Sequence, residues 1–344
     1  MNFCKPKLNN VILLRSFAIC MVVLYHCYCP FMISWNWIPN EYSAKFFYAL
    51  SYVMDGRMPL FIFISGYLFS HLVNDRGKYS TFIGFIKNKF KRLLVPCLTF
   101  MGIMCLVLHE NYFEHLIGYG FHLWFLKVLF LCFITCWLLH KYINNWKLEV
   151  VVAVIAFGMM ALPMIKYWAL GQFFKKFIFF YLGYLTYKYN NVFFYVTNTI
   201  KGLVVLTVMF VSLCVLGWLL FDSYNWDPSF EYRNVVAYKI LSIIGMGLVT
   251  PYFGLSLVNF IISHWQIEVA PTFFNKINNA SYGIYLFHVL YLQIIEKYYI
   301  ENFISIVGNH YVIAPLLLFL FILGLSIFST IIIKKFRFGE YIVG

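Results

Sequence analysis

Ten apolar runs, each close to the length needed to cross a lipid bilayer, divide this chain of 344 residues. A membrane-spanning helix needs about 20 mostly apolar residues. The runs are continuously apolar and do not alternate with polar residues, which favours helices over the strands of a barrel. We therefore expect an all-α integral membrane protein with about ten transmembrane helices. The expected spans cover approximately residues 9–30, 53–72, 93–109, 121–139, 148–165, 173–188, 202–221, 236–258, 281–300 and 313–333.

Composition and charge agree with a membrane protein. Hydrophobic residues make up 62% of the chain and charged residues 11%, whereas soluble domains carry about 25% charged residues. The net charge of +13 lies mainly in short loops, so it sets orientation and does not indicate nucleic-acid binding. With the N-terminus in the cytoplasm, sixteen lysines and arginines fall on the cytoplasmic side and seven on the other. Both termini are therefore predicted to be cytoplasmic.

Neither linkers nor metal-binding patterns interrupt the chain. Because no Pro/Gly/Ser-rich stretch separates two parts, we expect residues 1–344 to form a single membrane domain. The nine cysteines are scattered, without the spacing of a disulfide framework or a metal site, so no metal is expected. The first run is a full span with no small-residue cleavage site after it, so we expect it to be retained.

An arginine and a histidine lie within the first run, in the stretch LRSFAICMVVLYH. Arg15 and His26 are eleven residues apart; on a helix this is about 1,100° of rotation and ~16.5 Å of rise, so both leave the same face. An ionisable side chain inside the bilayer costs free energy, so residues of this kind within a membrane span are candidates for function by default. Alternatively, Arg15 snorkels to the cytoplasmic headgroups and His26 packs near the external interface. The shared face favours a polar stripe that lines a cavity.

Five further segments follow this pair: RMPLFIFISGYLF, KNKFKRLLVP, FHLWFLKVLF, FIFFYLGYLTYK and SYGIYLFH. Together with the Arg-x10-His pattern, the series resembles the membrane-bound acyltransferase-3 family over about residues 9–334. There are departures. Family members often carry Asp three residues before the first arginine and Gly just after it, where this chain has Ile12 and Ser16. Lys89 also replaces the first arginine of a cytoplasmic Arg-x-x-Arg element.

The resemblance implies an enzyme that moves an acyl group, first of all acetyl, from cytoplasmic acyl-CoA to a sugar hydroxyl. The implied acceptor is an extracytoplasmic or lipid-linked surface glycan, so O-acetylation of a cell-envelope polysaccharide is the first expectation. Acetyl-CoA, or another acyl-CoA, is then a donor substrate and not a permanently bound cofactor. The implied location is a bacterial inner membrane, among lipids. A multi-pass transporter or flippase for a glycan precursor is the alternative, although no internal repeat is visible; a silent scaffold is a third.

The resemblance also suggests residues for catalysis and for binding the donor. His26 would act as general base, because an imidazole exchanges protons near neutral pH, or it would carry the acyl group itself. Arg15 would reach a CoA phosphate or polarise the thioester carbonyl. Lys89 and Arg92 would capture the nucleotide phosphates, although they also fit a simple positive-inside signal. Ser65 would supply a hydroxyl inside the bundle.

Three residues expected near the external side would contact the acceptor: Arg57, His122 and Trp124. For Arg57, an ion pair with Asp55 is an equally plausible alternative. His288 is expected either as a polar contact within the bundle or as part of the donor tunnel. Ser281, at the start of the same motif, is a further candidate.

Overall fold

The computed structural model describes residues 9–31, 35, 50, 52–118, 120–161, 169–223, 236–307, 310, 313–337 and 339–343. Every regular element in these ranges is a helix, which confirms the all-α class. The chain divides into two compact units, one formed by Met1–Phe61 with Asn191–Ser329 and the other by Ile62–Asn190 with Thr330–Gly344. The expectation of a single domain over residues 1–344 stays a prediction.

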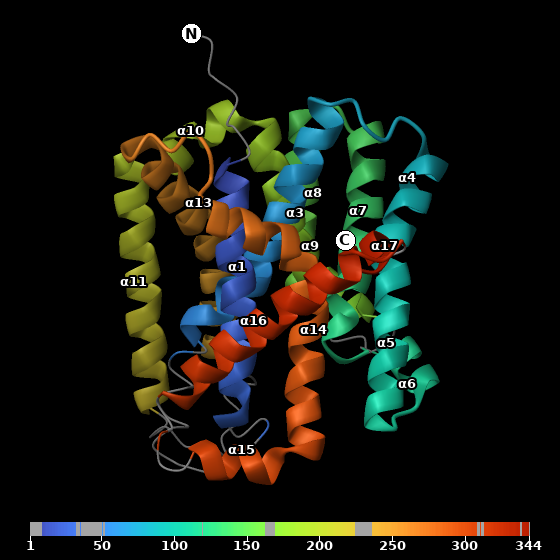
Figure 1. Cartoon of the computed structure of the whole chain (residues 1–344). Helices are drawn as coiled ribbons and strands as arrows, with labels where there is room; N and C mark the ends of the chain where they lie inside the picture. The colour runs from blue at the N-terminus through green and yellow to red at the C-terminus, as the bar shows by residue number, and fades with distance from the viewer. Residues whose placement is uncertain are drawn as a thin grey trace. The chain divides into compact units, whose positions relative to one another are not determined.

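The first unit contains the beginning and most of the C-terminal half of the chain (Figure 1). Its elements are α1 (Asn9–Tyr28), η1 (Cys29–Phe31), η2 (Met54–Gly56), α10 (Asn190–Asn198), α11 (Ile200–Ser223), α12 (Val236–Tyr238), the π-helical η8 (Lys239–Met246), α13 (Gly247–His264), α14 (Thr272–Tyr298), α15 (Ile300–Val307) and most of α16 (Ala314–Lys334). The helix α3 (Arg57–Asn74) begins in this unit and continues into the second.

The second unit contains the middle of the chain and its C-terminal end. Its remaining elements are α4 (Phe82–Lys89), the π-helical η3 (Phe90–Leu94), α5 (Val95–Leu108), α6 (Tyr112–Ile117), η4 (Phe121–Leu123), α7 (Trp124–Tyr142), α8 (Trp146–Gly158), η5 (Met159–Ala161), α9 (Leu170–Lys188) and α17 (Gly339–Val343).

Seven helical stretches among the described residues are long and apolar enough to cross a membrane. They are Asn9–Phe31, Met54–Asn74, Phe82–Leu108, Tyr112–Tyr142, Ile200–Ser223, Val236–His264 and Ala314–Lys334. The other three expected spans coincide with helices that fall short for identifiable reasons. The helix α8 has only 13 residues, whereas lysines and tyrosines lower the hydropathy of α9 and His288, Gln293, Glu296 and Lys297 lower that of α14. The count of ten and the cytoplasmic termini therefore stay predictions.

The start of α14 differs from the expected span at 281–300. The helix begins at Thr272, because the segment TFFNKINNA is helical although it is too polar to belong to an apolar run. The helix α14 packs mainly against α1, and this segment takes part in that contact. The Ser16 hydroxyl donates to the carbonyl of Phe274 at 2.9 Å and to that of Ile12 at 2.8 Å. Ser16, where the family often has glycine, thus joins α1 to α14.

A reciprocal glycine contact holds α3 and α9 together within the second unit. A Cβ added to Gly66 would lie 1.9 Å from the carbonyl oxygen of Phe180, and one added to Gly183 would lie 2.0 Å from that of Phe63. Each glycine therefore allows the backbone of the other helix to come closer than any side chain would permit. Gly66, in the SGYLF segment, is thus a point of close approach between α3 and α9.

Candidate functional site

Two histidines that are far apart in the sequence meet within the first unit. His26 lies in the last turn of α1, and His288 lies in the middle of α14. The Nε2 atom of His288 is 3.2 Å from Nδ1 of His26, and the ring centroids are 4.9 Å apart. His288 is fully buried, whereas His26 is partly exposed. The structure therefore shows the polar contact within the bundle that was one of the two expectations for His288.

Backbone carbonyls of the same helices orient both rings. Nδ1 of His26 lies 2.9 Å from the carbonyl oxygen of Val22, and Nδ1 of His288 lies 3.0 Å from that of Ile284. In each case the partner is four residues earlier, where an α-helix turns its carbonyl toward the next turn. The Tyr25 ring packs edge-on against His26, with 5.4 Å between the centroids. Two imidazoles with defined orientations form a unit that can accept, donate and share protons.

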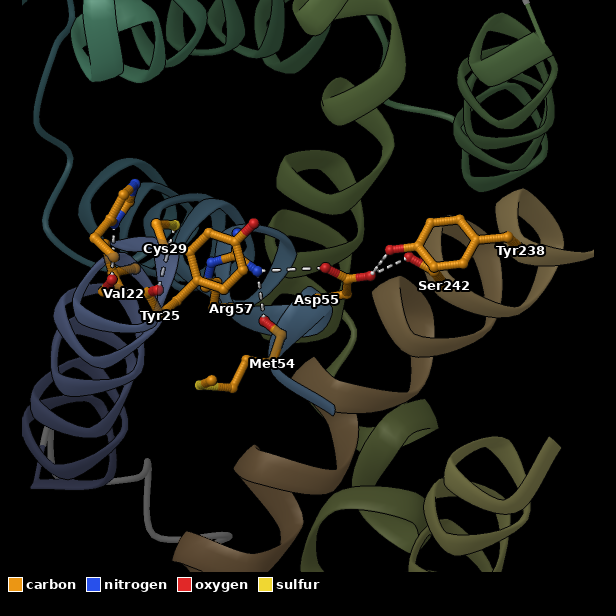
Figure 2. A network of polar contacts seen from close by, with 9 residues as sticks. Val22, Tyr25, Cys29, Met54, Asp55, Arg57, Tyr238 and Ser242 are labelled. Atoms are coloured by element: carbon orange, nitrogen blue, oxygen red, sulfur yellow. Dashed lines mark hydrogen bonds and ion pairs between the residues drawn. The ribbon is translucent and has the colours of Figure 1, made fainter. Parts of the chain in front are cut away.

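Arg57 is held at the first residue of α3 by three different groups (Figure 2). Its Nη1 atom donates to the carbonyl of Met54 at 2.9 Å and to Oδ1 of Asp55 at 3.4 Å. Its guanidinium carbon lies 3.3 Å from the centroid of the Tyr25 ring. The ion pair with Asp55, expected as an alternative, is therefore present. It leaves the guanidinium stacked on the residue that precedes His26.

The carboxylate of Asp55 connects Arg57 to α12 and η8 within the first unit. Its Oδ2 atom accepts hydrogen bonds from the Tyr238 hydroxyl at 2.7 Å and from the Ser242 hydroxyl at 2.5 Å, and Figure 2 shows it between these groups and Arg57. Sequence reasoning did not identify Tyr238 and Ser242. The available signal was their spacing of four residues, which places two hydroxyls on one helical face. The carboxylate charge is thus shared by one cation and two neutral donors.

Arg15 lies on α1 and is partly exposed. Because α1 is one continuous helix over Asn9–Tyr28, the expected common face of Arg15 and His26 follows from helix geometry. A tunnel that connects them stays a prediction. Ser281, by contrast, is buried and its hydroxyl donates to the carbonyl of Asn278 at 2.7 Å, so that hydroxyl bonds within its own helix.

The two expected phosphate-binding cations of the second unit differ in their surroundings. The Nζ atom of Lys89 lies 3.4 Å from the centroid of the Phe133 ring and 5.3 Å and 5.8 Å from those of Tyr79 and Phe85. Lys89 is only 7% exposed, whereas Arg92 in η3 is exposed. A charge in such an aromatic cluster stabilises packing. Of the two, Arg92 is therefore the better placed to meet a phosphate.

His122 and Trp124, the expected acceptor contacts of the second unit, come shortly after the end of α6. His122 is buried in η4, and Trp124 is the partly exposed first residue of α7. Lys127, one turn further, donates from Nζ to the carbonyls of His115, Leu116 and Gly118 at 3.1, 3.0 and 2.9 Å. Lys127 thus satisfies the C-terminal carbonyls of α6, and this explains a cation inside an apolar run.

Ser65 lies on α3 beside Gly66 and is partly exposed. It belongs, with Lys89, Arg92, His122 and Trp124, to the second unit, whereas the histidine pair, Arg15, Arg57 and Ser281 belong to the first.

In the part of the chain that the structure describes, no three His, Cys, Asp or Glu side chains gather into a group able to hold a metal ion.

Seven helical stretches that are long and apolar enough to cross a membrane, and a first unit that contains two contacting imidazoles and an anchored guanidinium, define a multi-pass membrane protein with ionisable groups in its interior. The comparison with protein families gives its class: residues 8–335 match the acyltransferase-3 family, described as an acyltransferase domain. The chain belongs to this family, so the resemblance found in the motifs is confirmed and the protein is a membrane acyltransferase. No curated protein and no solved structure matches the chain significantly.

Proposed function

We propose that the protein transfers an acyl group, most simply acetyl, from cytoplasmic acyl-CoA to a hydroxyl of a surface-glycan sugar. The match to the acyltransferase-3 family covers residues 8–335, nearly the whole chain, and supports the acyl transfer. The observation that carries the proposal is the meeting of His26 with His288 inside the bundle, beside a guanidinium stacked on Tyr25. A membrane protein places such groups together at a functional site.

In this proposal His26 is the general base. It takes the proton of the acceptor hydroxyl as the oxygen attacks the carbonyl carbon of the thioester. The tetrahedral intermediate then collapses, the C–S bond breaks, and the imidazolium returns the proton to the departing CoA thiolate. The products are an O-acyl sugar and free CoA. The alternative, in which His26 carries the acyl group itself, uses the same ring and adds one covalent step.

Two arginines are the proposed cations for the donor. Arg15 would bind a phosphate of CoA or polarise the thioester carbonyl, and Arg92 would form a bidentate contact with a nucleotide phosphate. Lys89 contributes less directly in this proposal, because its ammonium is packed among aromatic rings. Ser65 is a candidate for a hydrogen bond to the donor.

The acceptor would be a carbohydrate at or beyond the outer side of a bacterial inner membrane. His122, Trp124 and Arg57 are the proposed contacts, because aromatic faces stack on sugar rings and guanidinium groups bind hydroxyls and anions. The anchored geometry of Arg57 supports a contact of fixed direction. Ser281 has no role in this proposal, because its hydroxyl is bonded within α14.

The test uses membranes that contain the full chain, radiolabelled acetyl-CoA and surface glycan from a strain that lacks the protein. We expect label in the glycan with the wild type, and a loss of about 10²–10⁴-fold with His26→Gln. The matched control is His264→Gln, since His264 is an exposed residue at the end of α13. Glycan that crosses the membrane without gaining label would favour the flippase, and a fully active His26→Gln protein would remove the proposed chemistry.

A further inference from the structure

We propose that His288 is a positioning residue that holds His26 in the tautomer with its proton on Nδ1, so that Nε2 of His26 is the reacting atom. The proposal rests on the proposed function of His26 and adds to it a defined atom and a second residue. It is carried by three contacts that the two rings make with each other and with backbone carbonyls.

The tautomer of His288 follows from its own helix. Its Nδ1 atom lies 3.0 Å from the carbonyl oxygen of Ile284, and a carbonyl oxygen can only accept. The contact is therefore a hydrogen bond only if Nδ1 of His288 carries a proton. In the neutral ring, Nε2 then has a lone pair, and this atom faces Nδ1 of His26 at 3.2 Å.

The tautomer of His26 follows from two acceptors that converge on one atom. Nδ1 of His26 lies 2.9 Å from the carbonyl oxygen of Val22 as well as 3.2 Å from Nε2 of His288. A proton on Nδ1 is shared between both acceptors. A lone pair on Nδ1 would face the Val22 oxygen and lose that bond, even if His288 donated from Nε2. With both rings charged, two N–H groups would face each other. Only Nδ1–H on both rings makes all three contacts hydrogen bonds.

This arrangement has a direct chemical consequence. The lone pair of His26 is placed on Nε2, which is the atom that takes a proton or attacks a carbonyl. Once Nε2 is protonated, Nδ1–H continues to donate to His288 and to Val22, so the positive charge is stabilised without movement of either ring. His288 thus has the role of the orienting third member of a catalytic triad, but as a neutral acceptor and not as a carboxylate.

Three variants separate this role from a structural one. His288→Gln keeps an amide oxygen able to accept from Nδ1 of His26, whereas His288→Leu keeps volume and removes the acceptor. We expect transfer of label from acetyl-CoA to fall about 10–100-fold in the leucine variant, which is less than the loss expected when the general base itself is removed. The glutamine variant should recover most of this activity. His264→Gln again serves as the control.

The second readout is solid-state NMR of the full chain in lipid bilayers with isotope-labelled histidine, which distinguishes protonated from unprotonated ring nitrogens. The signals of His26 are identified by their loss in His26→Gln. We expect Nδ1–H on His26 in the wild type and in His288→Gln, and a mixture of tautomers in His288→Leu. This measurement on the wild type remains decisive even if the leucine variant does not fold.

The outcomes distinguish the two proposals. A wild-type His26 with its proton on Nε2, or a folded His288→Leu protein with full activity and an unchanged His26 tautomer, would overturn the positioning role while leaving His26 as the base. Full activity of His26→Gln would instead overturn the proposed function.

Discussion

The guanidinium carbon of Arg57 lies 3.3 Å from the centroid of the Tyr25 ring, so a cation at the start of α3 rests on the residue that precedes His26. Only 11% of the Arg57 side chain is exposed, and Met54 and Asp55 accept its hydrogen bonds. A guanidinium stacks on a ring and donates in its plane at the same time, which an ammonium does not do. The position of the charge therefore depends on arginine specifically.

The first prediction concerns this stacked arginine. Arg57→Lys keeps the charge but loses the planar contact with Tyr25, which is worth about 2 kcal/mol in a desolvated setting. We expect label transfer from acetyl-CoA to fall about tenfold or more. Tyr25→Leu should produce a similar loss, whereas Tyr25→Phe, which keeps the ring, should retain most of the activity. Wild-type turnover in both Arg57→Lys and Tyr25→Leu would contradict a catalytic use of this contact.

The second prediction concerns the Asp55 carboxylate that forms an ion pair with Arg57. Asp55→Asn removes the charge that balances a mostly buried guanidinium and weakens the bonds from Tyr238 and Ser242. Hydrogen bonds to charged groups contribute about 1.5–3 kcal/mol, so we expect a loss of about 2 kcal/mol, seen as a lower thermal midpoint in detergent. Ser242→Ala should cost less. The control is Asp222→Asn at the exposed end of α11; equal shifts in Asp55→Asn and Asp222→Asn would contradict the prediction.

Local patterns were sufficient to predict some of this site. The apolar runs indicated the helices, and the spacing of Arg15 and His26 placed both on one face because helix geometry is local. The contact between His26 and His288 could not be derived this way, since it joins residues 262 positions apart. Only the motif that contains His288 indicated it as a candidate. Its partner was settled by the packing of α1 on α14.

Burial of polar residues was the harder quantity to predict. The sequence placed Lys89 in a cytoplasmic Arg-x-x-Arg element, but in the structure its ammonium lies among aromatic rings, 3.4 Å from the centroid of Phe133. The polar beginning of α14 was missed for a related reason, because its Phe274 carbonyl accepts a hydrogen bond from Ser16 of α1. In both cases tertiary packing, which a window of sequence does not contain, decides which face a residue shows.

The third prediction concerns pH. Burial, together with the hydrogen bond to Glu149 at 2.5 Å and the charge of that residue, raises the pKa of Tyr189 to about 12. A neutral phenol is therefore favoured by the folded state. Its contribution to stability is full below the ordinary tyrosine pKa near 10 and is lost as the pH rises from about 10 to about 12. We expect the thermal midpoint of the wild type to fall more steeply in this window than that of Tyr189→Phe.

A matched control is Tyr195→Phe in α10, where the tyrosine is exposed. This variant should follow the wild type from pH 9 to pH 12, apart from effects common to all variants, such as loss of lysine charge near pH ~10.4. Parallel curves for the wild type, Tyr189→Phe and Tyr195→Phe would show that the Tyr189 hydroxyl does not contribute.

The fourth prediction concerns the glycine contact between α3 and α9. Gly66→Ala and Gly183→Ala would each place a Cβ about 2 Å from a backbone oxygen of the other helix. Because backbone cannot move aside as a flexible side chain does, each should cost about 1–3 kcal/mol. Gly158→Ala, where no described residue beyond the neighbouring helix backbone lies within 4 Å of the added carbon, should be neutral or slightly stabilising. Thermal midpoints in detergent check the three variants, and a neutral Gly66→Ala would mean that the helices are farther apart.

The last prediction separates the two basic residues that were expected to bind the donor. Arg92 is exposed and Lys89 is buried against Phe133, so the same charge reversal should act differently at the two positions. Arg92→Glu should raise the apparent KM for acetyl-CoA with little change in kcat or in thermal midpoint, because it removes an attraction that acts on binding. The effect should shrink as salt is added, since exposed charges are screened.

At Lys89 the expected signature is the reverse. Lys89→Glu should lower the thermal midpoint clearly, because a carboxylate cannot be placed among aromatic faces without loss of the cation–π attraction and a desolvation cost. Lys89→Met, which keeps the aliphatic volume, should restore most of the stability and leave the KM for acetyl-CoA near the wild-type value. If Lys89→Met instead raises that KM as strongly as Arg92→Glu, the ammonium reaches the donor and its packing among the rings is not its main role.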